Sequence, residues 1–248
     1  MTNKEFILNI TDRDIGKRFS KILACIKGKY EIQHMEDYLS NIYNIIIPAK
    51  DQENKISIIA HHDIYRGSLG YNDNSTGVVT LLKLQEADLP DNVELVFTDG
   101  EEFGGRGCSL YLNESVKPKI AINVDVVGLG NKIFYEKYGD GIKVDGKRME
   151  YFRNIPFSDS YILREYDVPN VLLLTGYSKE ALISNIFEAQ HNGPKDGMLD
   201  LIQEDIMDKV YDMVLDIVDM NAENPTKRCP HCGVSRLPHK DNCYSNAR

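Results

Sequence analysis

The 248-residue chain is long enough for one substantial domain with a small appendage, and 42% of its residues are hydrophobic. Its formal net charge of −9 argues against nucleic-acid binding by the main body. No apolar run approaches the ~18 residues that a membrane helix needs. Acidic residues also occupy the N-terminal stretch, where a secretion signal would be apolar. We therefore expect no membrane partner and a cytoplasmic location.

Expected helices and strands alternate along the chain. Apolar residues at helical spacing predict helices, and short apolar or alternating runs between turn residues predict strands. The expected helices cover 12–27, 75–86, a short segment from 109, 178–186 and 198–220. Thr11 or Asp12 would cap the first of them. The expected strands cover 30–35, 43–47, 56–60, 93–97, 120–124, 131–138 near an edge, and 171–174. This alternation predicts an α/β fold whose largely parallel sheet is covered by helices on both faces.

Histidine and carboxylate side chains follow three of the expected strands at the point where each strand ends. His61 and Asp63 follow the strand 56–60, Glu101 and Glu102 follow 93–97, and Asp125 follows 120–124. Because the carboxyl ends of parallel strands meet at one edge of a sheet, these side chains should converge. Each alone has a plain alternative as a turn residue or a solvated charge. Several converging carboxylates, however, need a cation to offset their repulsion, which predicts a metal site.

A set of motifs in a fixed order carries a resemblance to a known family. The order H-x-D, N-D-N-S-T-G, G-E-E-F-G-G-R-G, N-V-D and a late histidine resembles the M28 family of zinc metallopeptidases, the bacterial aminopeptidase type. The similarity covers about 56–201. It includes P-F-S-D-S and V-P-N-V-L-L, which are similar to that family's S-D-H segment and the strand after it. The resemblance implies a three-layer α/β/α sandwich with a mixed, largely parallel sheet, and a peptide substrate.

The resemblance also implies two catalytic zinc ions and a set of residues around them. The ligands would be His61 and Asp125 on one ion, Glu102 and His191 on the other, and Asp73 bridging both. Glu101 would be the general base, taking a proton from the attacking water and passing it to the leaving amine. Asp63 would accept the second N–H of His61 and fix its tautomer. The chain is therefore expected to be an aminopeptidase.

The chain also departs from the family pattern. Residue 190 is Gln where many members carry a tyrosine. The connection from Asp125 to Ser158 is also short, which indicates that the pocket that selects the substrate side chain is reduced or rebuilt. Glutaminyl cyclases share the expected fold, but their pocket relies on tryptophan, which this chain lacks. We interpret Asp196 as a helix N-cap rather than a ligand. Another amide hydrolase or cyclase on the same fold stays open as an alternative.

The last part of the chain forms a second predicted unit. Asn224-Pro225 ends the last expected helix, which divides the chain into a peptidase domain, 1–224, and a tail, 225–248. The tail contains C-x₂-C-x₆-H-x₃-C, formed by Cys229, Cys232, His239 and Cys243. This spacing fits one structural zinc ion in a knuckle that would bind a protein or a nucleic acid. The alternatives are a disordered tail with reactive thiols, or a non-catalytic metal-binding protein that acts through the knuckle.

Overall fold

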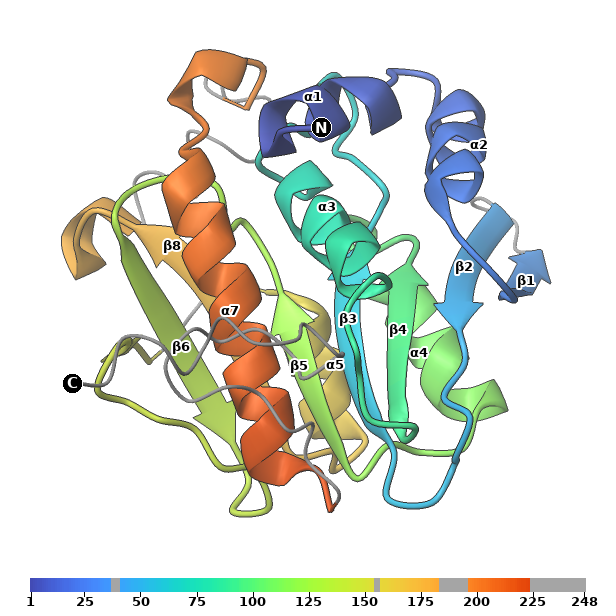
Figure 1. Ribbon diagram of the computed structural model, residues 1–248. Coiled ribbons are helices and arrows are strands. Elements are labelled where there is room, and N and C mark those ends of the chain that lie inside the picture. Colours follow the sequence, from blue (N-terminus) through green and yellow to red (C-terminus); the bar gives the residue numbers. More distant parts are fainter. Residues whose placement is uncertain (37–40, 154–156, 183–195, 224–248) are drawn as a thin grey trace, which may run out of the picture.

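The computed structural model describes residues 1–36, 41–153, 157–182 and 196–223 (Figure 1). Within them, eight strands form one sheet in the order β1-β2-β4-β3-β5-β8-β6-β7. The strands are β1 Glu31–Glu36, β2 Asn41–Ile47, β3 Ile56–His61, β4 Val93–Thr98, β5 Ile120–Val124, β6 Lys132–Tyr138, β7 Glu150–Tyr151 and β8 Asn170–Gly176. The helices are α1 Asn3–Ile10, α2 Ile15–Cys25, α3 Ser75–Leu84, α4 Arg106–Glu114, α5 Asp159–Glu165, the 3₁₀ turn η1 Leu199–Leu201 and α7 Glu204–Asn221.

The centre of the sheet is parallel and joins its outer strands through antiparallel pairs, while the edge strand β7 pairs in parallel with β6. Strand β3 pairs in parallel with β4 and β5, and β5 pairs in parallel with β8. Strands β1 and β2, and then β6 against β8, join in antiparallel register. In the β3–β4 pair His61 faces Thr98, and in the β3–β5 pair Ile59 faces Asn123. The chain therefore leaves the carboxyl ends of β3, β4 and β5 at one edge, as the sequence predicts.

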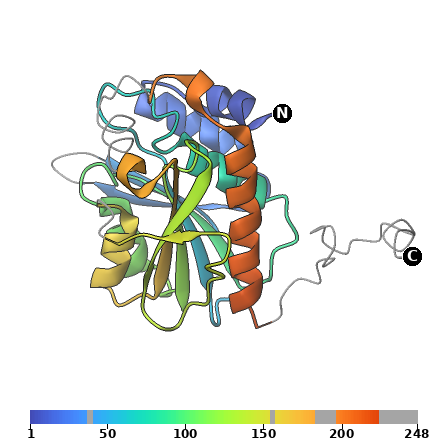
Figure 2. The same ribbon diagram turned by 90° about the vertical axis from the view of Figure 1, so that its left-hand side faces the viewer.

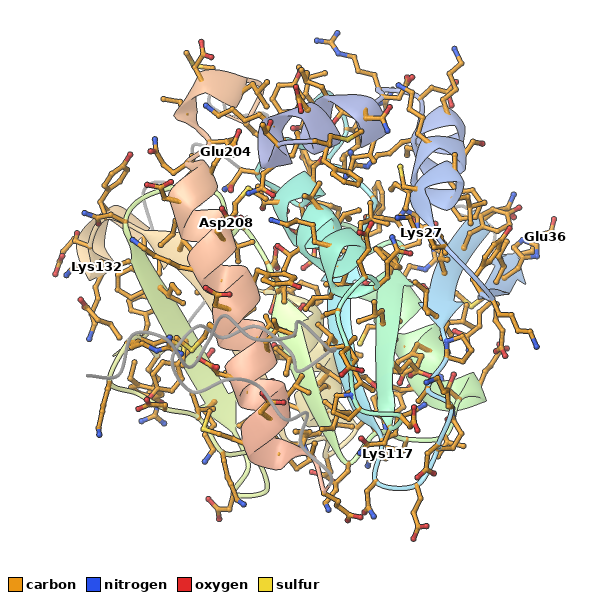
Figure 3. All side chains as sticks on the ribbon, in the orientation of Figure 1. Lys27, Glu36, Lys117, Lys132, Glu204 and Asp208 are labelled. Atoms are coloured by element: carbon orange, nitrogen blue, oxygen red, sulfur yellow. The ribbon has the colours of Figure 1, made fainter. Side chains whose placement is uncertain are left out.

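Helices cover both faces of the sheet and form three layers (Figures 1 and 2). Helices α1, α2, α3 and α7 lie on one face, and α4 and α5 lie on the other. Ile58 packs into the first core and its neighbour Ile59 into the second, because successive side chains of a strand point to opposite faces. Asp208 of α7, labelled in Figure 3, accepts hydrogen bonds from Asn3 of α1 and Lys83 of α3. This carboxylate ties three helices of one layer together.

The predicted α/β sandwich with a mixed, largely parallel sheet is confirmed, with several local corrections. Helix α2 begins later than expected and is capped by Asp14, whose side chain accepts from Lys17 N at 3.1 Å. The last helix begins at Glu204 after a 3₁₀ turn, and α1 and α5 lie where no helix was predicted. Of the helix expected at 178–186, residues 179–182 are helical and residue 178 is not, while 183–186 lie outside the described residues. No helix of the described chain is long and apolar enough to cross a membrane.

Candidate metal centre

Three buried side chains meet at the carboxyl edge of the sheet. His61 is the last residue of β3, Asp125 follows β5, and Asp73 lies in the loop before α3. His61 Nε2 lies 3.0 Å from Asp73 Oδ1 and 3.4 Å from Asp125 Oδ1. One ligand atom from each residue lies within 4.8 Å of the other two. The structure therefore brings together three of the five side chains that the sequence predicts as zinc ligands.

The geometry and chemistry of this cluster fit a bound cation. Nitrogen and oxygen ligands of one tetrahedral zinc lie roughly 3.3–3.6 Å apart, because each bond is about 2.0–2.2 Å long. His61 Nε2 and Asp125 Oδ1 are buried and make no hydrogen bond within the described part of the chain. Buried polar atoms without a partner are rare in native proteins. Imidazole and carboxylate are zinc ligands, so a zinc ion would give both atoms the partner they lack.

Asp63 links the imidazole ring to the turn that follows β4. Its Oδ1 atom lies 3.2 Å from His61 Nδ1 and accepts from Glu101 N at 3.2 Å, while Oδ2 accepts from Glu102 N at 3.1 Å. Burial alone would raise the pKa of Asp63, but the hydrogen bond and charge of His61 lower it below its ordinary value. An ionised Asp63 that accepts from Nδ1 leaves His61 Nε2 as the metal donor. The same carboxylate fixes the backbone of the expected general base.

The site gathers more acidic groups than the basic groups beside them can balance. Burial raises the pKa of Asp73 to about 7 and, with the charge of Asp73, that of Glu102 to about 9. Burial also raises the pKa of Glu101 well above its ordinary value, and the charge of Asp125 adds to this effect. Burial lowers the pKa of His61, yet the charges of Glu101 and Asp125 raise it well above ordinary. A bound cation would favour the ionised carboxylates in this cluster.

The segment before α3 is fastened to the loop that carries Asp125. Two side chains of this segment and one in the first turn of α3 make the bonds. Asn72 accepts from Gly128 N at 2.9 Å, and Asn74 donates to Val124 O at 2.9 Å and accepts from Val126 N at 3.3 Å. Thr76, in α3, accepts from Val127 N at 3.1 Å. Val126 has a φ of 47°, a conformation that is strained for a β-branched residue. These bonds hold the strained turn beside Asp125, and thereby fix that carboxylate relative to Asp73.

Asp196 corrects one prediction from the sequence. It is not an N-cap, because the following helical turn is preceded by Met198 and α7 by Gln203. Its buried carboxylate instead accepts hydrogen bonds from the loop that carries Asp73, through Ser68 Oγ, Gly70 N at 3.0 Å, Asn72 N at 2.8 Å and Asp73 N at 3.1 Å. Asp196 therefore shapes the loop of a candidate ligand from a point more than 120 residues away in the chain.

Several predicted residues lie outside the described part of the chain. They are Gln190, the candidate ligand His191 and the four candidate tail ligands Cys229, Cys232, His239 and Cys243. Their roles, and the domain boundary at 224, stay predictions.

Two buried residues beside the site were missed by reasoning from the sequence. Asp159, in the segment S-D-S, accepts from Thr98 Oγ1 at 2.6 Å, and burial raises its pKa to about 7. Arg18 is fully buried at the carboxyl end of β3. The sequence held a signal for Arg18, because an arginine stands among the apolar residues of an amphipathic helix, between Ile15 and Ile22. Such a position predicts a buried charge with a partner.

Comparison with known protein sequences identifies the family. Residues 41–215 match Peptidase family M28, and the chain belongs to this family. It is 31% identical over 140 residues to a "Probable leucine aminopeptidase 2" of Trichophyton verrucosum (strain HKI 0517), which covers 51% of this chain and 28% of that protein. The chain thus spans less than a third of the curated relatives it matches.

Solved structures of two kinds share the fold. One is BSAP, a zinc aminopeptidase from Bacillus subtilis, with a TM-score of 0.60, 17% identity, and coverage of 79% of this chain and 53% of that one. Another is a Bacteroides thetaiotaomicron glutaminyl cyclase, with a TM-score of 0.65, 17% identity, and coverage of 90% and 97%. At this identity the likeness concerns the fold alone, and both activities occur on it.

Proposed function

We propose that this chain is a dizinc aminopeptidase that hydrolyses the first peptide bond of substrates with a free amino terminus. The observation that carries the proposal is the buried cluster of His61, Asp73 and Asp125, in which two ligand atoms lack a hydrogen-bond partner within the described residues. His61 and Asp125 would hold one zinc, and Asp73 would bridge to a second zinc held by Glu102 and His191. Zinc bound there activates water and polarises the scissile carbonyl.

Glu101 moves the proton in the proposed reaction. Its carboxylate takes a proton from the attacking water and delivers it to the nitrogen of the leaving amine. Burial suits this role, because a carboxyl with a raised pKa accepts a proton more readily than an exposed one. The hydrogen bond from Glu101 N to Asp63 holds the base beside His61. Asp63 thereby serves both the ligand and the base, without itself exchanging a proton.

The Glu101→Gln variant tests this assignment. It should lower kcat by about 10²–10⁴-fold on a free-amine peptide, because glutamine cannot take the proton, while the zinc content per chain stays the same. Turnover and elemental analysis measure the two quantities. The matched control is Glu94→Gln, which changes a buried glutamate near the start of the same strand β4 and should leave kcat unchanged. Full turnover by a zinc-loaded Glu101→Gln variant would show that the mechanism is wrong.

A substrate panel separates the proposed activity from the alternatives on this fold. Peptides with a free amino terminus should be cleaved and their N-acetylated counterparts should not. Cleavage of blocked peptides would indicate another amide hydrolase. Ammonia release from peptides with N-terminal glutamine, without peptide-bond cleavage, would indicate a cyclase. A chain that turns over none of these while it binds metal would support a binding protein that acts through its tail.

A further inference from the structure

Arg18 places a buried guanidinium group between the two segments that carry His61 and Asp73. It lies on helix α2, and its exposed fraction is 0%. Its Nε atom donates to the backbone oxygen of His62 at 2.6 Å, and Nη1 donates to Ser75 Oγ at 2.9 Å. The first acceptor directly follows one candidate ligand in the chain. The second lies two residues after the other, at the start of α3.

The Arg18 contact continues into the loop before α3. Ser75 Oγ donates in turn to Gly70 O, and Ser75 N donates to the same oxygen at 3.0 Å. One guanidinium group therefore fixes the end of β3, the first turn of α3 and the loop between them. Because a planar guanidinium donates in fixed directions, it sets the relative position of its acceptors more tightly than an ammonium group can.

A buried charge at this position is costly unless the site compensates it. Burial lowers the pKa of Arg18 to about 10, while the charges of Asp63, Asp196 and Asp73 act in the opposite direction. The side chain therefore stays charged at neutral pH. Its Nη2 atom makes no hydrogen bond within the described residues. The carboxylates around the candidate metal centre are thus the counter-charge that makes this burial tolerable.

We propose that Arg18 is a positioning residue of the metal centre, which holds the His61 segment and the Asp73 segment at the separation that a shared cation requires. This inference rests on the proposed metal site. It also assigns a task to the N-terminal helices, because Arg18 precedes residue 41, where the match to the M28 family begins. Helix α2 is then part of the working site rather than an addition to it.

The charge and the hydrogen-bond geometry of Arg18 have opposite effects on metal binding. A fixed positive charge repels a second cation, so removal of the charge alone would tighten metal binding. Loss of the two guanidinium N–H donors would weaken metal binding, because the two ligand segments would no longer be held in place. Arg18→Lys keeps the charge but loses the planar pair of N–H donors, and Arg18→Met loses both the charge and the donors. If positioning dominates, both variants weaken metal binding.

The test measures zinc affinity of the full chain by competition with a chromophoric chelator, and the visible absorption of the Co²⁺-loaded chain. Both Arg18 variants should raise the zinc dissociation constant about tenfold or more, as loss of residues that orient metal ligands does. The Co²⁺ spectrum should change, because it reports ligand geometry. Ser75→Ala, a milder change because the donor Arg18 stays in place, should raise the dissociation constant about threefold, near the lower end of what the loss of one hydrogen bond costs.

Lys55→Met is the matched control, because Lys55 is a buried cation just before the other end of β3. It should lower the melting temperature but leave zinc affinity within about twofold and the Co²⁺ spectrum unchanged. Wild-type affinity and spectrum in the Arg18 variants, or tighter zinc binding in Arg18→Met, would overturn the role of Arg18 alone. An equal loss of affinity in Lys55→Met would overturn it too. A wild-type chain that binds no zinc would overturn the proposed function as well.

Discussion

Strands β3 and β4 carry buried charged side chains at both ends, and the two ends balance their charges differently. At the amino end, Lys55 Nζ lies 3.0 Å from Glu94 Oε1, and both side chains are buried. Tyr111 Oη donates to the same carboxylate and lies 2.7 Å from Ser57 Oγ. One cation meets one carboxylate, with hydroxyl groups around them. Such a network stabilises the native structure only while all of its members are present.

At the carboxyl end, carboxylates outnumber the cations that face them. His61 and Arg18 lie among the carboxylates of Asp63, Asp73, Glu101, Glu102 and Asp125. Burial and mutual repulsion raise the pKa of most of these acids, among them Asp73, Glu101 and Glu102. The contrast indicates that the carboxyl end of the strands is the less stable end, and that its arrangement serves function. Balanced buried charge marks the structural end of the sheet, and unbalanced charge marks the end where we propose that a cation binds.

The largest expected effect is at the balanced end. Lys55→Met should lower the free energy of unfolding by about 3–5 kcal/mol, because it leaves the Glu94 carboxylate buried without its cation. Urea unfolding at neutral pH measures the loss. The control is Lys50→Met, which removes the cation of an exposed pair in which Lys50 lies 2.7 Å from Asp91, and should cost far less because water screens the pair. Equal losses in the two variants would contradict the contrast between buried and exposed pairs.

The sequence predicts the strands and the convergence of their ends because both follow from local patterns. Continuous apolar runs such as 56–60 and 120–124 indicate strands covered on both faces, and parallel pairing then brings His61 and Asp125 to one edge. The strand 93–97 is likewise extended by only one residue in the structure. The register in which Ile59 faces Asn123 places residues 61 and 125 side by side, two positions further along each chain.

What the sequence leaves open depends on partners that are distant in the chain. Nothing local shows that the Asp196 carboxylate meets the backbone of 70–73, or that Arg18 meets His62. Asp196 could equally cap a helix, and the position of Arg18 predicts a buried charge without naming its partner. Helix α1 is a different case, because the sequence does contain a local signal for its start, the capping box of Thr2 and Glu5. The helix is too short for its apolar residues to show a clear helical spacing, so this signal stands alone.

The pH dependence of stability should show the excess charge directly. The metal-free folded chain holds Asp73 and Asp159 with pKa values of about 7, against an ordinary value of 3.8, so it keeps protons that the unfolded chain has lost. The stabilisation is complete below pH 4 and is lost as the pH rises through 7, and the raised pKa of His61 acts in the same direction. For one carboxyl the upper bound is about 4 kcal/mol, from about three pKa units.

Unfolding of the chelator-treated chain between pH 5 and 8 measures this slope. We expect the free energy of unfolding to fall across the range. Saturating zinc should reverse the trend, because metal binding requires the deprotonated ligands. A metal-free chain whose stability rises from pH 5 to 8 would show that the carboxylates at this end do not repel one another as described.

The smallest expected effect is that of Asp73→Asn on the free energy of unfolding, and its sign should be opposite to that of the equivalent change at the amino end of the strands. At pH 8, Asp73→Asn should raise the free energy of unfolding of the metal-free chain by at least about 1 kcal/mol, the value of one pKa unit, because a neutral amide relieves the repulsion. Zinc affinity should fall in the same variant. Glu94→Gln makes the equivalent change at the amino end and should lower stability, since it strands the Lys55 charge. Urea unfolding of both variants in the presence of a chelator measures the two changes in the free energy of unfolding. If Asp73→Asn also loses stability, the carboxyl end is a balanced network like the other, and its charge gives no reason to place a cation there.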